Sequence, residues 1–243
     1  MDTENQIKFS VNEIFKSIDG EGIFAGKPAA FVRFNGCNLR CSYCDTKYAL
    51  HKEEPNMLIS EIESKVMEYN VSHVTLTGGE PLIQPGIGNL IKILLLRGLT
   101  VNIETNGSID VDKFHREQIL CDVPSMVVMA GAFDNLVYTI DYKCTSSQCS
   151  EHNNMNNFNN ESIPGAMKVF KFVVGNEVDL QEAHNVIVKN ELCGIGECYL
   201  SPCYGDIEPK QIVEFILAHP DMNDVNIQLQ LHKIIWDPNK RGV

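Results

Sequence analysis

Short apolar and β-branched runs alternate along the chain with longer segments whose apolar residues recur every three to four positions. The short runs are typical of strands, and the longer period is typical of amphipathic helices. The expected strands cover residues 29–34, 73–77, 100–105, 138–142, 168–174, 198–201 and 225–231. The expected helices cover residues 58–69, 86–97, 177–192 and 209–219.

The order of these elements predicts the fold class. Strand followed by helix, repeated, indicates an α/β fold with a parallel sheet, either open or rolled into a barrel. No internal repeat and no second apolar core interrupts the order, so residues 1–243 are expected to form one domain. Helix 58–69 places Ile59, Ile62 and Val66 on one face, whereas helix 86–97 is apolar on nearly all sides and is expected to be well buried.

One segment departs from this alternation. Residues 150–162, SEHNNMNNFNNES, are rich in asparagine and nearly devoid of aliphatic side chains. Such a composition is typical of a segment that cannot build its own core. We therefore expect a mobile surface insertion at this place.

Polar and glycine-rich clusters follow most of the expected strands. Turns are polar in any protein, which accounts for the glycines and prolines but less well for the charged residues. In α/β folds, ligands bind at the carboxyl ends of the strands, where such clusters converge. The charged or titratable residues that accumulate there are Glu80, Glu104, Asp141, Lys143 and His232.

Charge and composition narrow the function classes. The chain carries 20 Lys and Arg against 32 Asp and Glu, a net charge of −12, which argues against nucleic-acid binding through phosphates. Its first residues, MDTENQIKFS, lack the basic start and apolar core of a secretory signal, and no apolar run is long enough to span a membrane. Nine cysteines without such a signal indicate a reducing cytoplasm and metal-binding or catalytic thiols.

Three of these cysteines lie close together with the spacing C-x3-C-x2-C. They are Cys37, Cys41 and Cys44. A structural zinc site would need a fourth ligand, from His51 or from the distant pair Cys193 and Cys198. Three unconnected cysteines are improbable at this density. An iron–sulfur cluster bound by thiolates is the third reading, and three ligands on a four-iron cluster would leave one iron open for a substrate or cofactor.

This spacing, with Tyr43 before the last cysteine, resembles the signature of the radical S-adenosylmethionine (SAM) superfamily. The segment TGGEP at 77–81 resembles the superfamily's glycine-rich SAM-binding segment. The resemblance implies a partial, incomplete TIM-like barrel and a [4Fe-4S] cluster whose open iron is chelated by SAM. It also implies that reduction of the cluster cleaves SAM to a 5′-deoxyadenosyl radical. From the residues alone, Gly78 and Gly79 would allow a close backbone approach, and Glu80 could support the loop.

A sharper resemblance extends over the whole chain. The segments SIDGEGIFAGKPAAFVRFNGCNLRCSYCDTKY, TGGEP, ETNG, DYKCTSS and LQLHKIIWDPNKRGV together resemble the 7-carboxy-7-deazaguanine synthase family. That family rearranges 6-carboxy-5,6,7,8-tetrahydropterin to 7-carboxy-7-deazaguanine with loss of ammonia, in queuosine and deazapurine biosynthesis. The resemblance implies hydrogen abstraction from C6 of the pterin, followed by ring contraction.

The resemblance also implies the residues of the site. The pterin would be held by Ile18, Asp19, Gly20, Glu21, Arg33, Thr77, His232 and Pro238. SAM would be held by Gly79, Glu104, Asn106, Asp141, Tyr142, Lys143, Ser201, Pro202, Cys203 and Tyr204. Many relatives have Gln in place of Asp19 and Ser-Pro in place of Asp141-Tyr142. The planar fork of an Arg33 guanidinium suits a carboxylate on physical grounds, although a salt bridge at a strand end is an equally common use of arginine.

Thr46 resembles the family's Mg²⁺ ligand. A single hydroxyl binds Mg²⁺ weakly, so oxygens of the pterin and water would have to complete the shell. Without the resemblance, Asp45 and Thr46 read equally well as a cap for the turn that follows. The resemblance further implies a homodimer and a flavodoxin or ferredoxin-type electron donor.

Two other functions compete with this one. A glycyl-radical activase would share the cysteines but would leave Arg33 and His232 without purpose, and a zinc-stabilised binding module would need no cluster. The remaining residues of note carry no role in this account: Cys121 and Cys149 read as incidental, Cys144 receives no ligand role, and Met126, Met129 and Trp236 read as packing residues.

Overall fold

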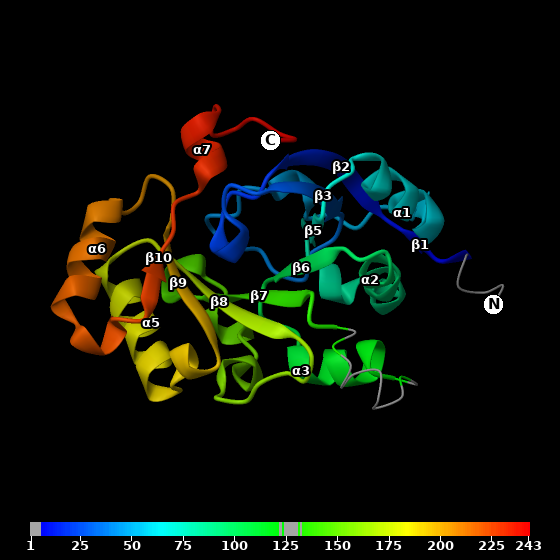
Figure 1. The fold of residues 1–243 in the computed structure, drawn as a ribbon. Helices are drawn as coiled ribbons and strands as arrows, with labels where there is room; N and C mark the ends of the chain where they lie inside the picture. The colour runs from blue at the N-terminus through cyan, green and yellow to red at the C-terminus, as the bar shows by residue number, and fades with distance from the viewer. Residues whose placement is uncertain (1–5, 122, 124–130, 132) are drawn as a thin grey trace.

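The computed structural model describes residues 6–121, 123, 131 and 133–243. Its centre is an eight-stranded sheet in the order β10-β9-β8-β7-β6-β5-β3-β2 (Figure 1). The strands are β2 (Val11–Ile18), β3 (Pro28–Phe34), β5 (His73–Gly78), β6 (Thr100–Thr105), β7 (Leu136–Lys143), β8 (Met167–Val174), β9 (Gly196–Pro202) and β10 (Val225–Ile227). Every neighbouring pair is parallel except β2 with β3.

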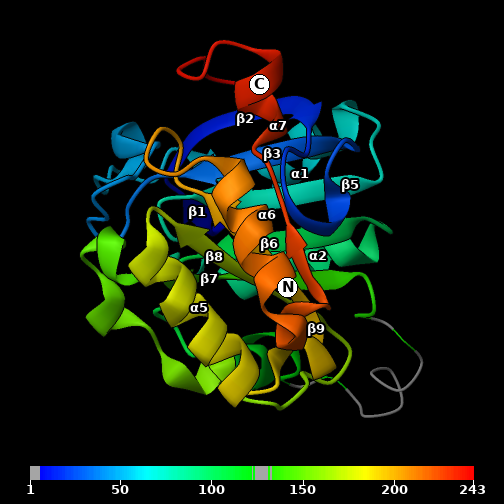
Figure 2. The same cartoon turned by 90° about the vertical axis from the view of Figure 1, so that its left-hand side faces the viewer.

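Helices cover the outer face of this sheet. They are α1 (Ile59–Glu68), α2 (Ile87–Leu96), α3 (Val111–Phe114), α5 (Glu177–Lys189) and α6 (Pro209–Ala218). The short helix α7 (Leu231–Ile235) lies instead at the open edge, where its residues His232 and Lys233 line an inner cavity. Figure 2 shows α5 and α6 side by side over β8 and β9. The strands β1 (Lys8–Phe9) and β4 (Met57–Leu58) pair in a separate two-stranded sheet, next to the start of β2. No helix within the described ranges has the length and apolar character needed to cross a membrane.

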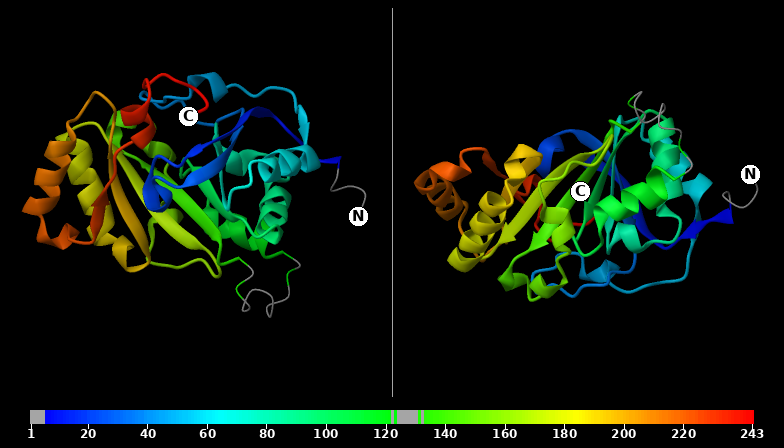
Figure 3. Two further views of the ribbon diagram at one scale, coloured as in Figure 1. Left: turned by 45° about the horizontal axis from the view of Figure 1, so that its top comes forward. Right: turned by 90° about the horizontal axis from the view of Figure 1, so that it is seen from below.

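The curved sheet does not close. Its edge strands β2 and β10 make no ladder with each other in the described part of the chain, which confirms the partial barrel. Loops bridge the two edges instead. The amide of Leu231 donates to the carbonyl of Gly20, and the amide of Gly22 donates to Oε1 of Gln228 at 2.7 Å. Figure 3 shows the segment after β10 lying beside the β2–β3 connection.

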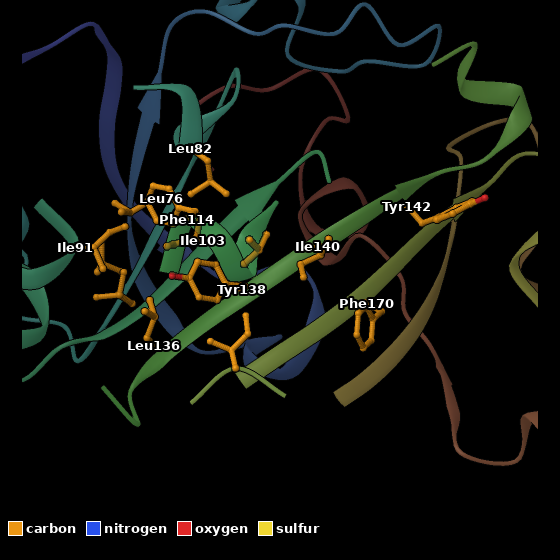
Figure 4. Close-up of a cluster of buried hydrophobic side chains, with 14 of the residues drawn as sticks. Leu76, Leu82, Ile91, Ile103, Phe114, Leu136, Tyr138, Ile140, Tyr142 and Phe170 are labelled. Carbon is orange, nitrogen blue, oxygen red and sulfur yellow. The ribbon is translucent and has the colours of Figure 1, made fainter. Parts of the chain in front are cut away.

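The strands carry a different chemistry on each face because successive side chains point to opposite sides. The outward side chains are mostly apolar and are buried against the helices, as Figure 4 shows for Leu76, Ile103, Ile140 and Phe170. The inward side chains are largely polar. Their alternation with the apolar set, in segments such as VNIET and YTIDYK, places a row of polar groups inside the curved sheet.

Most expected elements are confirmed, with shifts of a few residues at their ends. Ile59, Ile62 and Val66 of α1 are all buried. Helix α2 is largely buried: six of its residues are buried, three are half-buried, and Leu96 is 86% exposed. The expected strand 225–231 is wrong beyond Ile227, because the chain leaves the sheet there and begins α7 at Leu231. Strand β2 was not predicted.

The expectation of a mobile surface insertion at 150–162 needs correction. Asn157 and Phe158 in its centre are buried. Oδ1 of Asn157 accepts from the amide of Val111 at 2.8 Å, and its Nδ2 donates to the carbonyls of Gly107 and Ile109. The side-chain amide thus satisfies backbone groups at the start of α3, and this segment packs into the domain despite its polarity.

The expected packing roles of Met126 and Met129 lie outside the described residues. Trp236 is half-buried at the end of α7.

Candidate active site

The loop that carries the three cysteines follows β3, at the carboxyl end of the parallel strands. The loop is closed by backbone hydrogen bonds from Gly36 to Ala49 at 2.8 Å and from Cys37 to Leu50 at 3.1 Å. Gly36 has φ +92°, a left-handed conformation that favours glycine. One cavity of about 170 Å³ is lined by all three cysteines, Cys37, Cys41 and Cys44.

The spacing of the three thiols bears on the choice between a single zinc ion and an iron–sulfur cluster. In the described chain, one set of three potential ligands has its atoms all within 4.8 Å of one another, and that set is Cys144, Asp179 and Glu182 rather than the three loop cysteines. A single tetrahedral zinc at about 2.3 Å from each sulfur would hold the sulfurs about 3.8 Å apart. At least one pair of the loop sulfurs is more than 4.8 Å apart, which is wider than a single zinc ion would hold them. Such a spacing fits a cluster, in which each thiolate binds a separate iron.

The second expected zinc ligand pair is also wrongly placed. Cys198 lies early in β9, and Cys193 precedes that strand. Both therefore lie toward the amino end of the sheet, whereas the cysteine loop lies at the carboxyl end. The acidic set around Cys144 is likewise committed to structure, because the Asp179 carboxylate accepts from the amides of Ser146 and Gly175.

Two of the loop thiols, Cys37 and Cys41, are poor nucleophiles. Burial raises the pKa of Cys37, and burial raises the pKa of Cys41 to about 12. Thiols of this kind stay protonated until a metal displaces the proton, which argues against a catalytic cysteine. Sγ of Cys37 faces the amide of Leu39 at 3.4 Å and Nδ2 of Asn106 at 3.6 Å. Such donors support a cluster-bound thiolate.

The Gly-Gly-Glu-Pro turn after β5 packs directly against the cysteine loop. A Cβ on Gly79 would lie 2.0 Å from the carbonyl oxygen of Gly36, and one on Gly78, which has φ +121°, would lie 2.4 Å from the backbone of Phe34. Both positions therefore require glycine. The close approach of the two backbones brings the turn to the wall of the cysteine cavity.

Glu80 supports this turn from beneath, as expected. Its carboxylate is fully buried and accepts from the amides of Leu82 and Asn106 and from Oγ1 of Thr105, at 2.7–2.9 Å. Burial raises the pKa of Glu80, and the three donors counteract this effect. Because Asn106 also reaches Cys37, Glu80 links three polar segments at the carboxyl ends of β3, β5 and β6.

Most of the residues predicted to hold SAM line the cysteine cavity. These are Gly79, Glu104, Asn106, Asp141, Lys143, Pro202, Cys203 and Tyr204. Nζ of Lys143 lies 2.5 Å from Oδ2 of Asp141, and Sγ of Cys203 lies 2.9 Å from Oδ2 of Asp206. Glu104 accepts from Oγ1 of Thr77 at 2.6 Å. Burial, together with nearby acidic groups, raises the pKa of Glu104 to about 7.

Two members of the predicted SAM set do not line the cavity. Tyr142 lies on the apolar face of β7, where its ring packs against Phe158 and Phe172 and its hydroxyl donates to Glu182 (Figure 4). The period of the strand explains this placement, since Tyr142 alternates with the inward-facing Asp141 and Lys143. Ser201 is buried, and its Oγ has no hydrogen-bond partner among the described residues. A side-chain role for Tyr142 is therefore wrong, whereas the role of Ser201 stays a prediction.

A larger cavity of about 1050 Å³ adjoins the first. Cys44, Thr46, Thr77, Glu104 and Lys171 line both cavities. Every residue predicted to hold the pterin lines the larger one: Ile18, Asp19, Gly20, Glu21, Arg33, Thr77, His232 and Pro238. Residues 239–243 line it as well, and the guanidinium of Arg241 lies 3.6 Å from the Tyr48 ring centroid.

The guanidinium of Arg33 is fixed by a hydrogen bond, and its terminal donors are available to bind an anion. Its Nε donates to Oε1 of Glu13 at 2.9 Å, and the hydroxyl of Tyr48 donates to the same oxygen at 3.1 Å. The terminal nitrogens of the guanidinium have no hydrogen-bond partner among the residues that the structure describes. Because Arg33 neighbours Thr77 in the register of β3 and β5, these free donors lie on the inward face.

Asp19 lines the larger cavity, but its carboxylate is engaged elsewhere. Oδ2 lies 3.1 Å from Nε2 of His73 and 3.0 Å from Oγ1 of Thr75, and Oδ1 accepts from the amide of Glu21 at 3.2 Å. The side chain is almost fully buried. The prediction that Asp19 contacts substrate therefore needs correction for its carboxylate, which holds the loop at 19–22 in place.

His232 approaches the same loop from α7. A Cβ on Gly20 would lie 2.6 Å from Nδ1 of His232, so the contact requires glycine at position 20. Burial lowers the pKa of His232, which favours the neutral imidazole at neutral pH. A neutral ring offers one donor and one acceptor to a bound molecule.

Lys171 and Lys233 were missed at the sequence level. Nζ of Lys171 lies 2.5 Å from Oε2 of Glu21, and Nζ of Lys233 lies 3.2 Å from Oδ2 of Asp45. A lysine in the middle of the apolar strand KVFKFVV was a signal for the first. Lys233 had no such signal, because its partner Asp45 is distant in the sequence.

Thr46 lines both cavities, and its Oγ1 lies 3.7 Å from Sγ of Cys44. It precedes the short helical turn Lys47–Ala49, but its side chain makes no capping hydrogen bond to that turn. The hydroxyl of Thr46 therefore does not cap this turn.

Comparisons with known proteins agree with this site. Residues 31–123 match the family model described as the radical SAM superfamily. A 7-carboxy-7-deazaguanine synthase from Clostridium acetobutylicum is 41% identical over 98% of this chain and 100% of its own length. Another from Chlorobaculum tepidum is 38% identical, with 96% of this chain and 97% of the relative covered.

A solved structure shares the fold. QueE from Escherichia coli superposes with a TM-score of 0.64 at 21% identity, covering 94% of this chain and 96% of that one. Together with the full-length relatives, the three-cysteine loop, the adjoining cavities and the partial barrel show that the chain belongs to the 7-carboxy-7-deazaguanine synthase family of radical SAM enzymes.

Proposed function

We propose that this enzyme converts 6-carboxy-5,6,7,8-tetrahydropterin to 7-carboxy-7-deazaguanine with loss of ammonia, as a carbon–nitrogen lyase. The observation that carries the proposal is the pair of adjoining cavities. One is lined by the three cysteines, and the other is lined by an arginine whose terminal donors are free. The names of the full-length relatives supply the product.

The residues of the smaller cavity fit a [4Fe-4S] cluster and SAM. The widely spaced thiols, the N–H donors near Cys37 and the cradle formed by Gly79 suit them. When bound, the cluster and SAM would supply the radical chemistry needed to remove hydrogen from C6 of the pterin. The chain binds, orients and shields the reacting groups.

The larger cavity supplies the groups that would orient the pterin. The terminal nitrogens of Arg33 match a carboxylate, because a guanidinium offers parallel donors in a plane. Glu13 fixes the direction of this fork through Nε. Neutral His232 and the Glu21 carboxylate face the cavity from other elements and would bind polar atoms of the ring.

The Thr46 hydroxyl makes no capping hydrogen bond and lines both cavities, which supports a Mg²⁺ role at their boundary. The pterin carboxylate and water would supply the remaining oxygens. In a reconstituted enzyme, Thr46→Val should raise the Mg²⁺ concentration required for half-maximal rate. An unchanged Mg²⁺ dependence would remove Thr46 from this role.

We also propose a homodimer, a cytoplasmic location and a flavodoxin or ferredoxin-type electron donor, in keeping with the family. Sedimentation tests the first, localisation of the tagged protein in its host tests the second, and reduction of the reconstituted protein by a purified flavodoxin tests the third.

The deciding experiment is anaerobic purification with cluster reconstitution, followed by incubation with SAM, reductant, Mg²⁺ and the carboxytetrahydropterin. Mass spectrometry should detect 7-carboxy-7-deazaguanine, and deuterium at C6 should pass to 5′-deoxyadenosine. A protein that contains zinc but no iron or sulfide, or one that forms no product, would overturn the proposal.

A further inference from the structure

We propose that Lys171 is a positioning residue for the pterin, holding the Glu21 carboxylate where N–H donors of the substrate meet it. This inference rests on the proposed function, because it assigns Lys171 a role toward the same substrate. Neither the sequence patterns nor the comparisons assign a role to Lys171.

The ion pair spans the interior of the curved sheet. Lys171 lies in the middle of β8, in register with Asp141 on β7, and its side chain is 16% exposed. Its Nζ lies 2.5 Å from Oε2 of Glu21, whose side chain is 11% exposed. Glu21 lies in the connection from β2 to β3, at the amino end of the parallel strands. The pair therefore ties the wall of the cavity to the loop at its opposite end.

The second oxygen of Glu21 is the group that points to a ligand. Oε1 is buried and has no hydrogen-bond partner among the described residues. A buried acceptor without a donor costs free energy, so a native structure that retains one has a use for it. Glu21 lines the larger cavity. A pterin carries a ring N–H and an amino group side by side, and both are donors that suit a fixed carboxylate.

Lys171 also determines the charge of Glu21. The charged or titratable groups that face Glu21 and Lys171 come from several elements: His232 from α7, Glu104 from β6, Asp141 and Lys143 from β7, Asp45 from the cysteine loop and Asp19 from the loop that carries Glu21. Burial alone would raise the pKa of Glu21, but attraction to Lys171 brings this pKa below its ordinary value.

Removal of Lys171 would reverse the direction of that shift. Of the groups that lower the pKa of Glu21, the Gln230 side chain and His232 would then remain, and His232 is neutral at neutral pH, so we expect burial to dominate and raise the pKa of Glu21. As pH falls through the raised pKa, Glu21 would take up a proton and lose an acceptor for the substrate.

The test uses reconstituted holoenzyme and the carboxytetrahydropterin. In Lys171→Met, KM for the pterin should rise about 10- to 100-fold, the cost of a lost charge-assisted hydrogen bond. KM should rise further as the assay is made more acidic, while KM for SAM stays unchanged. Lys171→Arg should restore most of the affinity and remove the added pH dependence.

Lys168 provides a matched control on the same strand. Its side chain is buried on the opposite face, where Nζ lies 3.4 Å from Asp112 and 2.8 Å from the carbonyl of Glu161. Lys168→Met should lower stability without changing KM for the pterin or its pH profile. Equal behaviour of Lys168→Met and Lys171→Met would show a merely structural role and overturn the inference.

A second variant covers the case in which Lys171→Met does not fold. Glu21→Gln keeps the size of the side chain and should raise KM for the pterin by a similar factor, without added pH dependence. Lys171→Arg in that background should change KM little. An unchanged KM in Glu21→Gln would also overturn the inference. Failure of the wild-type protein to form any deazaguanine would instead refute the proposed function.

Discussion

Replacement of Glu80 by alanine gives a direct test of how the site is built. The Glu80 side chain is fully buried and accepts from three donors, two of which are the backbone amides of Leu82 and Asn106. In Glu80→Ala these amides lose their acceptor, at about 1–3 kcal/mol for each buried donor left unsatisfied. Thr105 can turn its hydroxyl to another acceptor, so we expect a total loss of about 2–6 kcal/mol.

Glu80→Gln separates two contributions to the loss of stability: the loss of the accepting oxygens and the loss of side-chain volume. The amide keeps the shape and one accepting oxygen, but its NH2 group faces one of the three donors. We expect a loss of about 1–3 kcal/mol, the cost of one unsatisfied donor. The assay is urea unfolding of the cluster-free protein under anaerobic, reducing conditions, because release of iron would make the transition multi-state.

Glu182 is the matched control. Its carboxylate also accepts from three donors, the hydroxyl of Tyr142 and the amide and hydroxyl of Thr145, but it is only half-buried. Water can replace the lost acceptor, so Glu182→Ala should cost about 1 kcal/mol. If Glu80→Ala is no more destabilising than Glu182→Ala, the buried acceptor does not organise the site as we argue.

Three further predictions concern the walls of the cavities. Gly79→Ala should abolish retention of iron by displacing the Gly36 carbonyl, as measured by iron and sulfide content, and full retention would contradict the close approach. Arg33→Lys should raise KM for the pterin about 10-fold or more while leaving KM for SAM unchanged, since an ammonium cannot reproduce the planar fork; an equal rise in both would indicate a general distortion. The pKa of Glu104, raised to about 7, means that this group stabilises the fold fully below the unfolded pKa near 4.5 and loses that contribution as pH rises to about 7. Wild type should therefore lose stability relative to Glu104→Gln across that interval in urea titrations, and a constant difference would place the pKa at its ordinary value.

The sequence predicted most of the sheet because its strands are buried on one face and polar on the other. It failed at β2 for a physical reason. The apolar residues Val11, Ile14, Phe15 and Ile18 have the spacing of a helix rather than of a strand, and a register shift between Val11 and Glu13 obscures the strand period.

The candidate site was predictable where its residues follow the parallel strands. The loop at 19–22 is different, because antiparallel β2 delivers it to the amino end of the sheet, where no rule for parallel folds places a ligand. The Glu21–Lys171 pair depends on that geometry. Tyr142 was wrongly predicted to face SAM. The resemblance assigned a role to each of Asp141, Tyr142 and Lys143, whereas successive side chains of a strand point to opposite faces of the sheet.

The bridging of the sheet edges by loops has a consequence for the entry of substrate and the release of product. Separating any two neighbouring strands from β3 to β9 would break a complete ladder, whereas parting β2 from β10 would break few bonds, among them those from Leu231 to Gly20 and from Gly22 to Gln228. The weakest line in the wall of the large cavity thus runs along this seam. We expect a bulky heterocycle to enter and leave the large cavity along this seam, because opening the seam breaks the fewest hydrogen bonds.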